Sequence, residues 1–307
     1  MKIGLVTDIG GLNDRGFNHL SYLGLLRAQH ELGISQRVYQ AKSTQDYVPN
    51  LSTFARQGYA LTIGVGFTEA TAIDTAATNF PKSNFAIVDV DQTTEPHKPA
   101  NLLGLLFKEQ ETGYLVGYLA GLEEKRKPGP DVIGSVGGQK QPPVDRFIAG
   151  YQAGAKAADP GIKTLNGYSQ DFSDQAKCKQ VALNQIEQGA GVIFQVAGGC
   201  GLGALDAAKE KNVMGIGVDA DQGYLGSHIL TSAEKKVDVA VYTTIQSRAK
   251  AGGAFRGGYN AIFSAKSNGV GVGKWSPKVP ASIRTAVAKQ LALLKAGKVP
   301  GIPQTVK

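Results

Sequence analysis

Short apolar runs alternate with longer amphipathic segments along most of this 307-residue chain. A short run bounded by turn residues predicts a buried strand, and apolar residues at helical spacing predict an amphipathic helix. The first strands are predicted at Lys2–Thr7, Arg37–Gln40, Leu61–Val65, Phe85–Asp89 and Asn101–Phe107. The first helices are predicted at Gly16–Leu32, Tyr47–Gln57 and Thr68–Asn79, the last with Thr68 as its N-cap. This alternation indicates a parallel sheet.

The same alternation starts again after residue 107. Helices are predicted at Glu109–Leu122, Pro143–Ala157, Asp174–Gln188 and Leu202–Lys211, and strands at Asp131–Val136, Lys163–Gly167, Val192–Val196, Met214–Val218 and His228–Ser232. The tail is predicted as a long helix over Lys236–Ala251, strand and turn over Gly257–Val272, and a last helix over Ala281–Gly297. Two α/β halves with a chain that crosses between them would leave a cleft, and such clefts are favoured small-molecule sites.

Composition agrees with this class of fold. The chain is long enough for two domains, and 42% hydrophobic with 19% charged residues is normal for a soluble globular protein. The 40 glycines fall at strand and helix ends, which favours many short turns over disorder. No apolar run approaches the roughly 18 residues that a spanning helix needs.

The net charge of +8 raises the question of a polyanionic partner. The lysines are spread along the chain, and no basic stripe is interleaved with aromatic residues, so the pattern disfavours nucleic-acid binding. A basic surface that approaches an anionic membrane explains the charge at least as well. No signal peptide is visible ahead of the first strand, which leaves a cytoplasmic protein and an exported one numbered after its removed signal both open.

The chain has two cysteines, too few for a metal site on their own. Cys178 falls in the first turns of a predicted helix, and Cys200 follows the next predicted strand. A helix start and the end of the following strand lie at the same edge of a parallel sheet, so a disulfide between them is geometrically allowed. A disulfide and two free thiols are both compatible with this placement.

Polar and aromatic residues stand just after the predicted strands, where α/β sheets bind ligands. They are Asp8, Asn13, Asp14 and Phe17 after the first strand, Gly66 after the third, Asp89 and Asp91 after the fourth, and Phe172, Gly198, Asp219 and Lys235 in the second half. Two phenylalanines can stack on a flat ring, and carboxylates can bind hydroxyls and ring nitrogens. The set predicts a polar ligand with a flat part, such as a nucleoside, and disfavours a phosphorylated one because the carboxylates would repel phosphate.

Each of these residues also has a structural explanation. Asp and Asn are common after strands as turn formers and helix caps, and Phe17 has the spacing of a core residue. Catalytic patterns are not found: the four histidines are scattered, and the glycine-rich stretch at 198–203 lacks the Lys-Ser/Thr ending of a phosphate loop. No nucleophile–base pair supports an enzyme, and neither a cofactor nor a metal is expected.

Four segments resemble the basic membrane protein (BMP) family of substrate-binding lipoproteins of ABC importers, which includes receptors for purine nucleosides. They are TDIGGLNDRGFN at 7–18, LLFKEQETGYLVGYLAG at 105–121, VIFQVAGGCGLGALDAAKEKNVMGIGVDADQ at 192–222 and LTSAEKKVDVAVY at 230–242. The resemblance implies a type I periplasmic-binding-protein fold, with two Rossmann-like lobes, three crossovers and an interlobe cleft. The lobes would be residues 1–107 with about 233–256, and residues 108–232 with about 257–307, the placement of the last helix being left open.

The resemblance also implies roles for the strand-end residues. Asp8, Asn13, Asp14, Phe17 and one of Asp89 and Asp91 would line the first lobe, and Phe172, Gly198, Asp219 and Lys235 the second. The two phenylalanines would stack the base, while the acids and the lysine hold the base edge and ribose. Position 200 is Cys where the family leads us to expect a small residue such as Thr, so that loop could be tied to Cys178.

The function predicted on these grounds is a non-enzymatic, extracytoplasmic binding protein of an ABC importer for a purine nucleoside. The resemblance implies a monomer that meets permease subunits at the membrane, with an N-terminal lipid anchor outside this numbering. Two alternatives stay open: a member of the same family that binds another flat ligand such as a flavin, and a nucleoside hydrolase.

Overall fold

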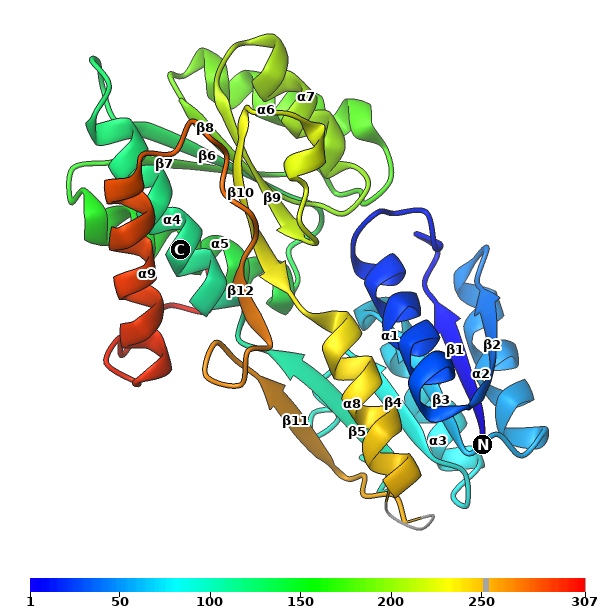
Figure 1. Cartoon of the computed structure of the whole chain (residues 1–307). Helices are drawn as coiled ribbons and strands as arrows, with labels where there is room; N and C mark the ends of the chain where they lie inside the picture. Colours follow the sequence, from blue (N-terminus) through cyan, green and yellow to red (C-terminus); the bar gives the residue numbers. More distant parts are fainter. Residues whose placement is uncertain (251–253, 307) are drawn as a thin grey trace. The chain divides into compact units, whose positions relative to one another are not determined.

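The structure is a computed structural model that describes residues 1–250 and 254–306, and it divides into two compact units (Figure 1). Unit 1 comprises Met1–Phe107 and Val237–Phe263, and unit 2 comprises Lys108–Lys236 and Ser264–Lys307. Two boundaries differ from the expected ones. Residues 233–236 stay with unit 2 because they end a strand of its sheet, and residues 259–263 belong to unit 1 because they pair with its sheet.

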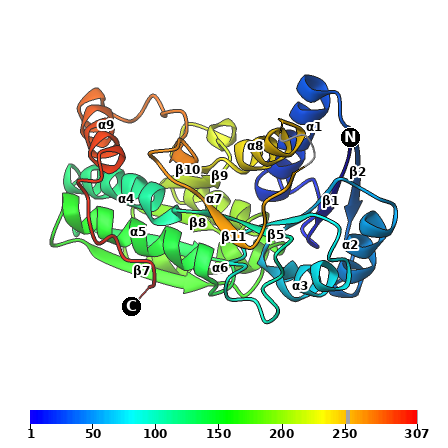
Figure 2. The same cartoon turned by 90° about the horizontal axis from the view of Figure 1, so that it is seen from below.

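Unit 1 is a three-layer α/β sandwich around a six-stranded parallel sheet. Its elements are β1 (Lys2–Thr7), α1 (Phe17–Leu32), β2 (Ser35–Gln40), η1 (Thr44–Asp46), α2 (Tyr47–Arg56), β3 (Leu61–Val65), η2 (Phe67–Glu69), α3 (Ala70–Asn79), β4 (Phe85–Val88), β5 (Leu102–Phe107), α8 (Val237–Lys250) and β11 (Tyr259–Phe263). The strand order is β11-β5-β4-β3-β1-β2. Helices α1 and α8 pack together on one side of the sheet, and α2 and α3 pack together on the other (Figure 2).

Unit 2 repeats this plan. Its elements are α4 (Glu109–Lys125), β6 (Val132–Gly137), α5 (Pro142–Ala158), β7 (Lys163–Tyr168), α6 (Gln175–Glu187), β8 (Val192–Val196), α7 (Gly201–Glu210), β9 (Met214–Asp219), η3 (Gly223–Leu225), β10 (Ile229–Lys235), β12 (Val270–Val272) and α9 (Ala281–Lys295). The strand order is β12-β10-β9-β8-β6-β7, with β12 antiparallel to β10 and the other pairs parallel. The first five strands of each unit therefore follow the same order, and the sixth differs in direction.

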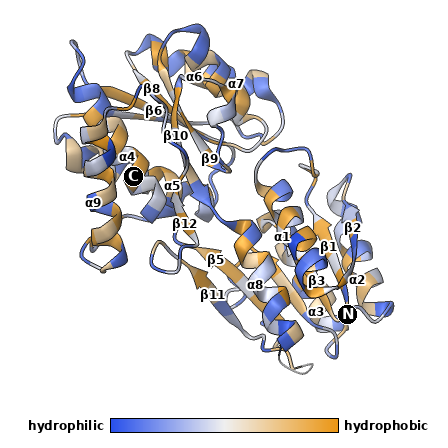
Figure 3. Cartoon of the chain, viewed as in Figure 1, coloured by the Kyte–Doolittle hydropathy of each residue, from blue (hydrophilic) through white to orange (hydrophobic). Residues whose placement is uncertain are grey.

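The apolar runs of the sequence became the inner strands. Every residue of β3, β4, β6 and β8 is buried, as expected for parallel strands covered on both faces. Figure 3 shows hydrophobic residues along the strands of both sheets. Helix boundaries lie within a few residues of the predicted ones. Thr68 is not an N-cap, because it lies inside the short turn η2 and α3 begins only at Ala70. The last predicted residue of the long helix, Ala251, lies outside the described residues.

Helices α4 and α5 of unit 2 approach each other unusually closely. Gly117 faces the backbone of Tyr151, and Gly154 faces the backbone of Tyr114, at distances that leave no room for a Cβ atom. This packing fixes the start of α4 against α5 and so positions the charged residues described below. Among the described residues, no helix is both long and apolar enough to cross a bilayer.

Candidate ligand-binding edges

Three of the predicted ligand residues, Asp8, Gly66 and Gly198, follow strands that lie where the sheets reverse their order. The chain adds strands on one side and then on the other, which gives β2-β1-β3-β4 in unit 1 and β7-β6-β8-β9 in unit 2. The loops that leave the two strands at such a reversal diverge, so the carboxyl edge there accepts ligands in open α/β sheets. Asp8 and Gly66 follow β1 and β3, whereas Gly138 and Gly198 come after β6 and β8.

At the edge of unit 1, Asp8, Phe17 and Gly66 come together. Asp8 Oδ1 accepts hydrogen bonds from Gly10 N at 2.8 Å and Asn18 Nδ2 at 2.7 Å. A Cβ atom added to Gly66 would lie 3.1 Å from Asp8 Oδ2 and 3.3 Å from Phe17 Cε1. Gly66 also has a φ of +105°, which side-chain-bearing residues rarely adopt. The edge thus combines a carboxylate oxygen, an aromatic ring and closely approaching backbone.

Two acids of this edge have raised pKa values. Burial raises the pKa of Asp8, against the opposing effect of its hydrogen bonds from Asn18 and Gly10. Glu69, in the turn η2, is completely buried, and burial raises the pKa of its carboxyl group well above the ordinary value. Glu69 Oε1 accepts from Val65 N at 3.4 Å, and the negative charge of Asp8 raises its pKa further.

Asp14 is engaged by the start of α1. Its carboxylate accepts from the backbone N–H groups of Gly16, Asn18 and His19, at 3.0, 2.7 and 3.0 Å. These are the N–H groups that a helix start leaves without intrahelical partners, so Asp14 caps α1 from two residues ahead of Gly16. Asn13 lies beside it in an exposed turn. In this structure Asp14 orders the segment that carries Phe17.

The structure distinguishes Asp89 from Asp91. Asp91 Oδ1 accepts from Thr93 N, Thr93 Oγ1 and Asn260 Nδ2, at 2.9, 2.5 and 2.6 Å, so it forms the turn after β4 and ties it to β11. Asp89 is buried directly at the end of β4, with a φ of +66°. Positive φ at a non-glycine residue is uncommon and concentrates at functional sites.

In unit 2, Phe172 lies in the loop between β7 and α6. Its ring packs against Gly138, where any Cβ atom would collide with it. Its carbonyl oxygen accepts from Cys200 N at 2.9 Å. Gly198 and Gly199 approach the same carbonyl, and Gly198 has a φ of +55°. Gly198, a predicted ligand residue, and its neighbour Gly199 therefore lie against the backbone of Phe172.

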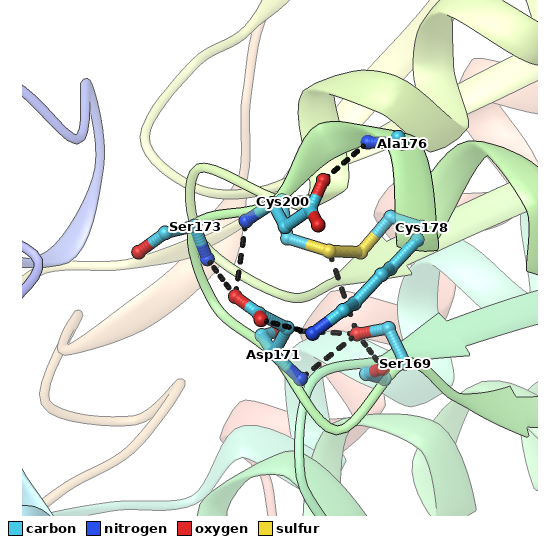
Figure 4. Close-up of polar contacts among 9 residues, drawn as sticks. Ser169, Asp171, Ser173, Ala176, Cys178 and Cys200 are labelled. Carbon is cyan, nitrogen blue, oxygen red and sulfur yellow. Dashed lines mark hydrogen bonds and ion pairs between the residues drawn. A yellow bond between two sulfur atoms is a disulfide. The ribbon is translucent and has the colours of Figure 1, made fainter.

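Cys178 and Cys200 form a disulfide, with their Cα atoms 5.5 Å apart (Figure 4). Next to it, Asp171 Oδ1 accepts from Ser173 N and Asp174 N at 2.8 and 3.0 Å. Lys177 forms an ion pair with the other oxygen of Asp171 at 2.7 Å. That ammonium group, followed by the two backbone N–H donors, holds the pKa of Asp171 far below its ordinary value.

Asp219 and Lys235 complete the edge of unit 2. Asp219 ends β9 with a φ of +61°, the counterpart of Asp89 at the end of β4. Lys235 ends β10, where its neighbour Glu234 pairs with Asp219. The Lys235 side chain is only 2% exposed, and its Nζ lies 3.0 Å from Glu109 Oε1.

Glu109 also binds Arg146, with 2.6 Å between Glu109 Oε2 and Arg146 Nε. The fully buried carboxylate thus lies between two cations, one from β10 and one from α5. A buried carboxylate is tolerated when paired in this way. In this structure the lysine predicted to bind ligand is anchored by a residue that the sequence reasoning did not single out.

Comparison with known proteins settles the family. The chain matches the Bmp family, described as "ABC transporter substrate-binding protein PnrA-like", over residues 1–302. The chain belongs to the Bmp family. It is 35% identical to the ABC transporter nucleoside-binding protein BmpA of Lactococcus lactis subsp. cremoris, an alignment that covers 97% of this chain and 88% of that protein. An uncharacterized lipoprotein of Pyrococcus horikoshii is 36% identical, over 88% of this chain and 68% of that protein.

Solved structures agree on the fold. A solute-binding protein of an ABC transporter system from Aeropyrum pernix K1 superimposes on this chain with a TM-score of 0.87 and 25% identity. The match covers 99% of this chain and 94% of the Aeropyrum chain. One from Conexibacter woesei has a TM-score of 0.78 at 24% identity over the full length of both chains. The predicted fold class, a type I periplasmic-binding fold, is confirmed. As an ABC transporter substrate-binding protein of the Bmp family, the chain has a small-molecule ligand and permease partners implied by its family.

The structure of this Bmp protein also contains supporting residues that the sequence did not indicate. Glu109, Arg146 and Gly138 hold predicted ligand residues in place, yet none was a candidate. Gly138 had a signal: it follows β6 in the same position as Asp8 follows β1. Glu109 lies within one of the segments that resemble the family, but its partners are far away in the sequence.

Two negative observations concern the part of the chain that the structure describes. It contains no group of three or more His, Cys, Asp or Glu side chains arranged to hold a metal ion. A groove of about 570 Å³ in unit 1 is lined by Asn84, His97, Asn101 and Phe255 among others. Asn84 and Asn101 precede β4 and β5, so this groove lies at the amino ends of these strands, and no predicted ligand residue lines it.

Proposed function

We propose that this Bmp protein is an extracytoplasmic receptor that binds a purine nucleoside, and that both edges contribute to binding. The observation that carries the proposal is the matched pair of edges. Each has one phenylalanine, one glycine of positive φ and one strand-end aspartate of positive φ: Phe17, Gly66 and Asp89 in unit 1, and Phe172, Gly198 and Asp219 in unit 2.

These residue types suit a nucleoside. Aromatic rings stack on a base whatever its identity, and carboxylates accept hydrogen bonds from ribose hydroxyls and from base N–H groups. The carboxylates also disfavour a phosphorylated ligand, since like charges repel more strongly in a partly buried site than in water. The name of the Lactococcus relative, a nucleoside-binding protein, supports the same ligand class.

The binding role is proposed to be non-enzymatic. The protein would act as a monomer. An N-terminal lipid would hold it at the membrane, as the lipoprotein names of three Pyrococcus relatives suggest. We propose Asp89 rather than Asp91 as the ligand residue, because Asp89 is buried directly at the end of β4 with a φ of +66°, whereas Asp91 forms the turn that follows. We propose a positioning role for Asp14, whose carboxylate caps α1.

Isothermal titration calorimetry with inosine, guanosine, adenosine, riboflavin and ribose tests the proposal. We expect a purine nucleoside to bind most tightly and ribose alone to bind weakly. Phe17→Ala and Phe172→Ala should each weaken nucleoside binding by about 1–3 kcal/mol, the scale of stacking a base on an aromatic ring. Tyr224→Ala, on an exposed residue of η3, tests whether removing any aromatic ring has the same effect.

Two results would overturn the proposal. If riboflavin binds and nucleosides do not, the ligand is another flat molecule. If chromatography after incubation with inosine shows free hypoxanthine at a rate proportional to protein concentration, the protein is an enzyme. Native mass spectrometry of the freshly purified protein adds a check, because a tightly bound nucleoside released slowly would be retained.

A further inference from the structure

The disulfide of unit 2 lies directly behind the segment that carries Phe172. Cys178 belongs to the first turns of α6, the helix that follows Phe172, and Cys200 immediately precedes α7. Both cysteines are fully buried, so the crosslink is part of the interior. The two helix starts also touch directly, since Gly203 of α7 packs against the backbone of Gln175 at the start of α6.

Two contacts connect the crosslink to Phe172. The first is the hydrogen bond from Cys200 N to the Phe172 carbonyl oxygen, 2.9 Å long, which joins the crosslinked residue to the aromatic residue itself. The second runs through Ser169, whose Oγ lies 3.4 Å from Cys200 Sγ and donates to the carbonyl of Asp171 at 2.9 Å (Figure 4). Cys200 therefore contacts the backbone on both sides of the Phe172 side chain, directly at the Phe172 carbonyl and through Ser169 at the Asp171 carbonyl.

The crosslink supports both contacts, in addition to the backbone bonds from Ser169 N and Gln170 N to the carbonyl oxygens of Gly137 and Gly138. The turn at 197–200 is rich in glycine, which leaves its backbone free to adopt many conformations when unrestrained. Apart from its packing against Gly203, the start of α6 is held by side chains at the surface, such as the ion pair between Asp171 and the half-exposed Lys177, and exposed pairs of this kind contribute little. The disulfide fixes the glycine-rich turn to α6 and so keeps the Cys200 N–H group opposite the Phe172 carbonyl.

We propose that the Cys178–Cys200 disulfide is a positioning element for ligand binding, which holds Phe172 in its ligand-binding arrangement by tying the 198–200 turn to the start of α6. The inference rests on the proposed function for the role of Phe172. The crosslink raises ligand affinity by positioning Phe172, and does not only stabilise unit 2.

A double-mutant cycle tests this inference. The variants are Cys178→Ala/Cys200→Ala, Phe172→Ala and the triple variant, each titrated with the nucleoside that the wild type binds most tightly, well below its melting temperature. We expect removal of the disulfide to weaken binding by about threefold or more in the wild type, but by less than about twofold when Phe172 is already Ala, because contacting residues couple. An equal loss in both backgrounds, or no loss in the wild type, would overturn the inference.

Leu119→Ala is the matched control for stability. Leu119 is a fully buried residue of α4, in the helix pair that packs apart from α6 and α7, so its truncation lowers the stability of unit 2 without touching the Phe172 loop. We expect Leu119→Ala to lower the melting temperature while leaving the dissociation constant within about twofold of the wild type. A loss of affinity equal to that of the disulfide variant would show that stability alone explains the effect, and would overturn the inference.

Hydrogen exchange separates this inference from the proposed function. If the wild type binds no nucleoside, the proposed function fails, and the amide of residue 200 decides the structural part. We expect this amide to be protected in the wild type by its bond to the Phe172 carbonyl and to exchange faster in Cys178→Ala/Cys200→Ala. Unchanged protection in that variant would overturn the inference whatever the ligand.

Discussion

The two units have the same order in their first five strands, but their carboxyl edges are held in different ways. In unit 1, carboxylates hold the edge by accepting hydrogen bonds: Asp8 accepts from Gly10 and Asn18, and Asp14 caps α1. In unit 2, a disulfide fixes the loop of Phe172, and a buried carboxylate between two cations fixes Lys235. One topology can therefore support an aromatic residue at the same edge by hydrogen bonds or by a covalent crosslink.

This difference decides what each edge is sensitive to. Hydrogen bonds to carboxylates depend on the protonation of the acid, and a single substitution removes them. A disulfide does not titrate, and a buried ion pair is strongly destabilised when one partner is removed. We therefore expect the edge of unit 1 to respond to single substitutions of its acids and to pH, and the edge of unit 2 to respond mainly to changes at the disulfide and at the buried ion pair.

The largest effect is expected for Glu109→Ala in unit 2. It leaves Lys235 and Arg146 without the carboxylate between them, and removing one partner of a buried ion pair costs about 3–5 kcal/mol of unfolding free energy. Chemical denaturation measures the loss of unfolding free energy, and hydrogen exchange shows whether β10 and α5 are affected. Nucleoside affinity should fall as well, because Lys235 is no longer anchored.

The matched control for that substitution is Glu210→Ala. Glu210 also pairs with a lysine of unit 2, Lys179, at 2.5 Å, but its side chain is 56% exposed. Exposed pairs contribute roughly 0–1 kcal/mol, so little change in stability is expected. Similar losses from the two variants would mean that burial does not distinguish the two ion pairs, and that the Glu109 pair is not a special support of the unit 2 edge.

A smaller effect is expected for Asp14→Ala in unit 1. The substitution removes a side-chain cap that accepts from three N–H groups of α1, and such losses cost about 1–2 kcal/mol. The first turn of α1 should fray, which displaces Phe17 and weakens nucleoside binding. Hydrogen exchange of the amides of residues 16–19 and calorimetry measure the two consequences.

Asp171→Ala in unit 2 is the counterpart of that substitution. Asp171 also accepts from two backbone N–H groups beside an aromatic residue, but the disulfide holds the same loop. We expect its effect on affinity to be smaller than that of Asp14→Ala, and to grow when the disulfide is removed. If Asp171→Ala weakens binding as much as Asp14→Ala while the disulfide is intact, the crosslink does not back up the loop.

Much of this architecture follows from local patterns. The inner strands are apolar runs buried on both faces, so the sequence pattern predicted each of them. The positions of the strand-end residues followed from the predicted strand ends. Contacts between distant segments were not visible. Glu109 meets Lys235 and Arg146 only because α4, α5 and β10 pack together, and Gly138 matters only because the Phe172 ring rests on it.

The cysteines and acids show the same limit. Pairing of Cys178 with Cys200 was one of two options, because a separation of 22 residues allows it only if the strand and helix between them form the expected unit. Asp14 was compatible both with ligand binding and with capping, since both use the same carboxylate. The three N–H groups that donate to its carboxylate could be assigned only once the backbone path of residues 14–19 was known.

The smallest expected effect is a difference in pH dependence between the two edges. Burial raises the pKa of Glu69 well above its ordinary value near 4.5, so the folded state holds this proton over a range where the unfolded chain has lost it. Stability then falls as the pH rises through that range. Asp171 has the opposite sign: its pKa is lowered, so its contribution is present above its ordinary value near 3.8 and is lost as the pH falls below it.

The variants Glu69→Gln and Asp171→Asn separate the two contributions. The stability of each is measured by urea denaturation between pH 3 and pH 7, and hydrogen exchange then reports the stability of each unit. The stability of Glu69→Gln relative to wild type should increase as the pH rises from about 4.5, because the amide carries no charge to bury. Asp171→Asn should be less stable than wild type near neutral pH, with a deficit that shrinks below about pH 4 as the wild-type carboxylate is protonated. Parallel pH profiles for the two variants would mean that the edges do not differ in the way their carboxylates are held.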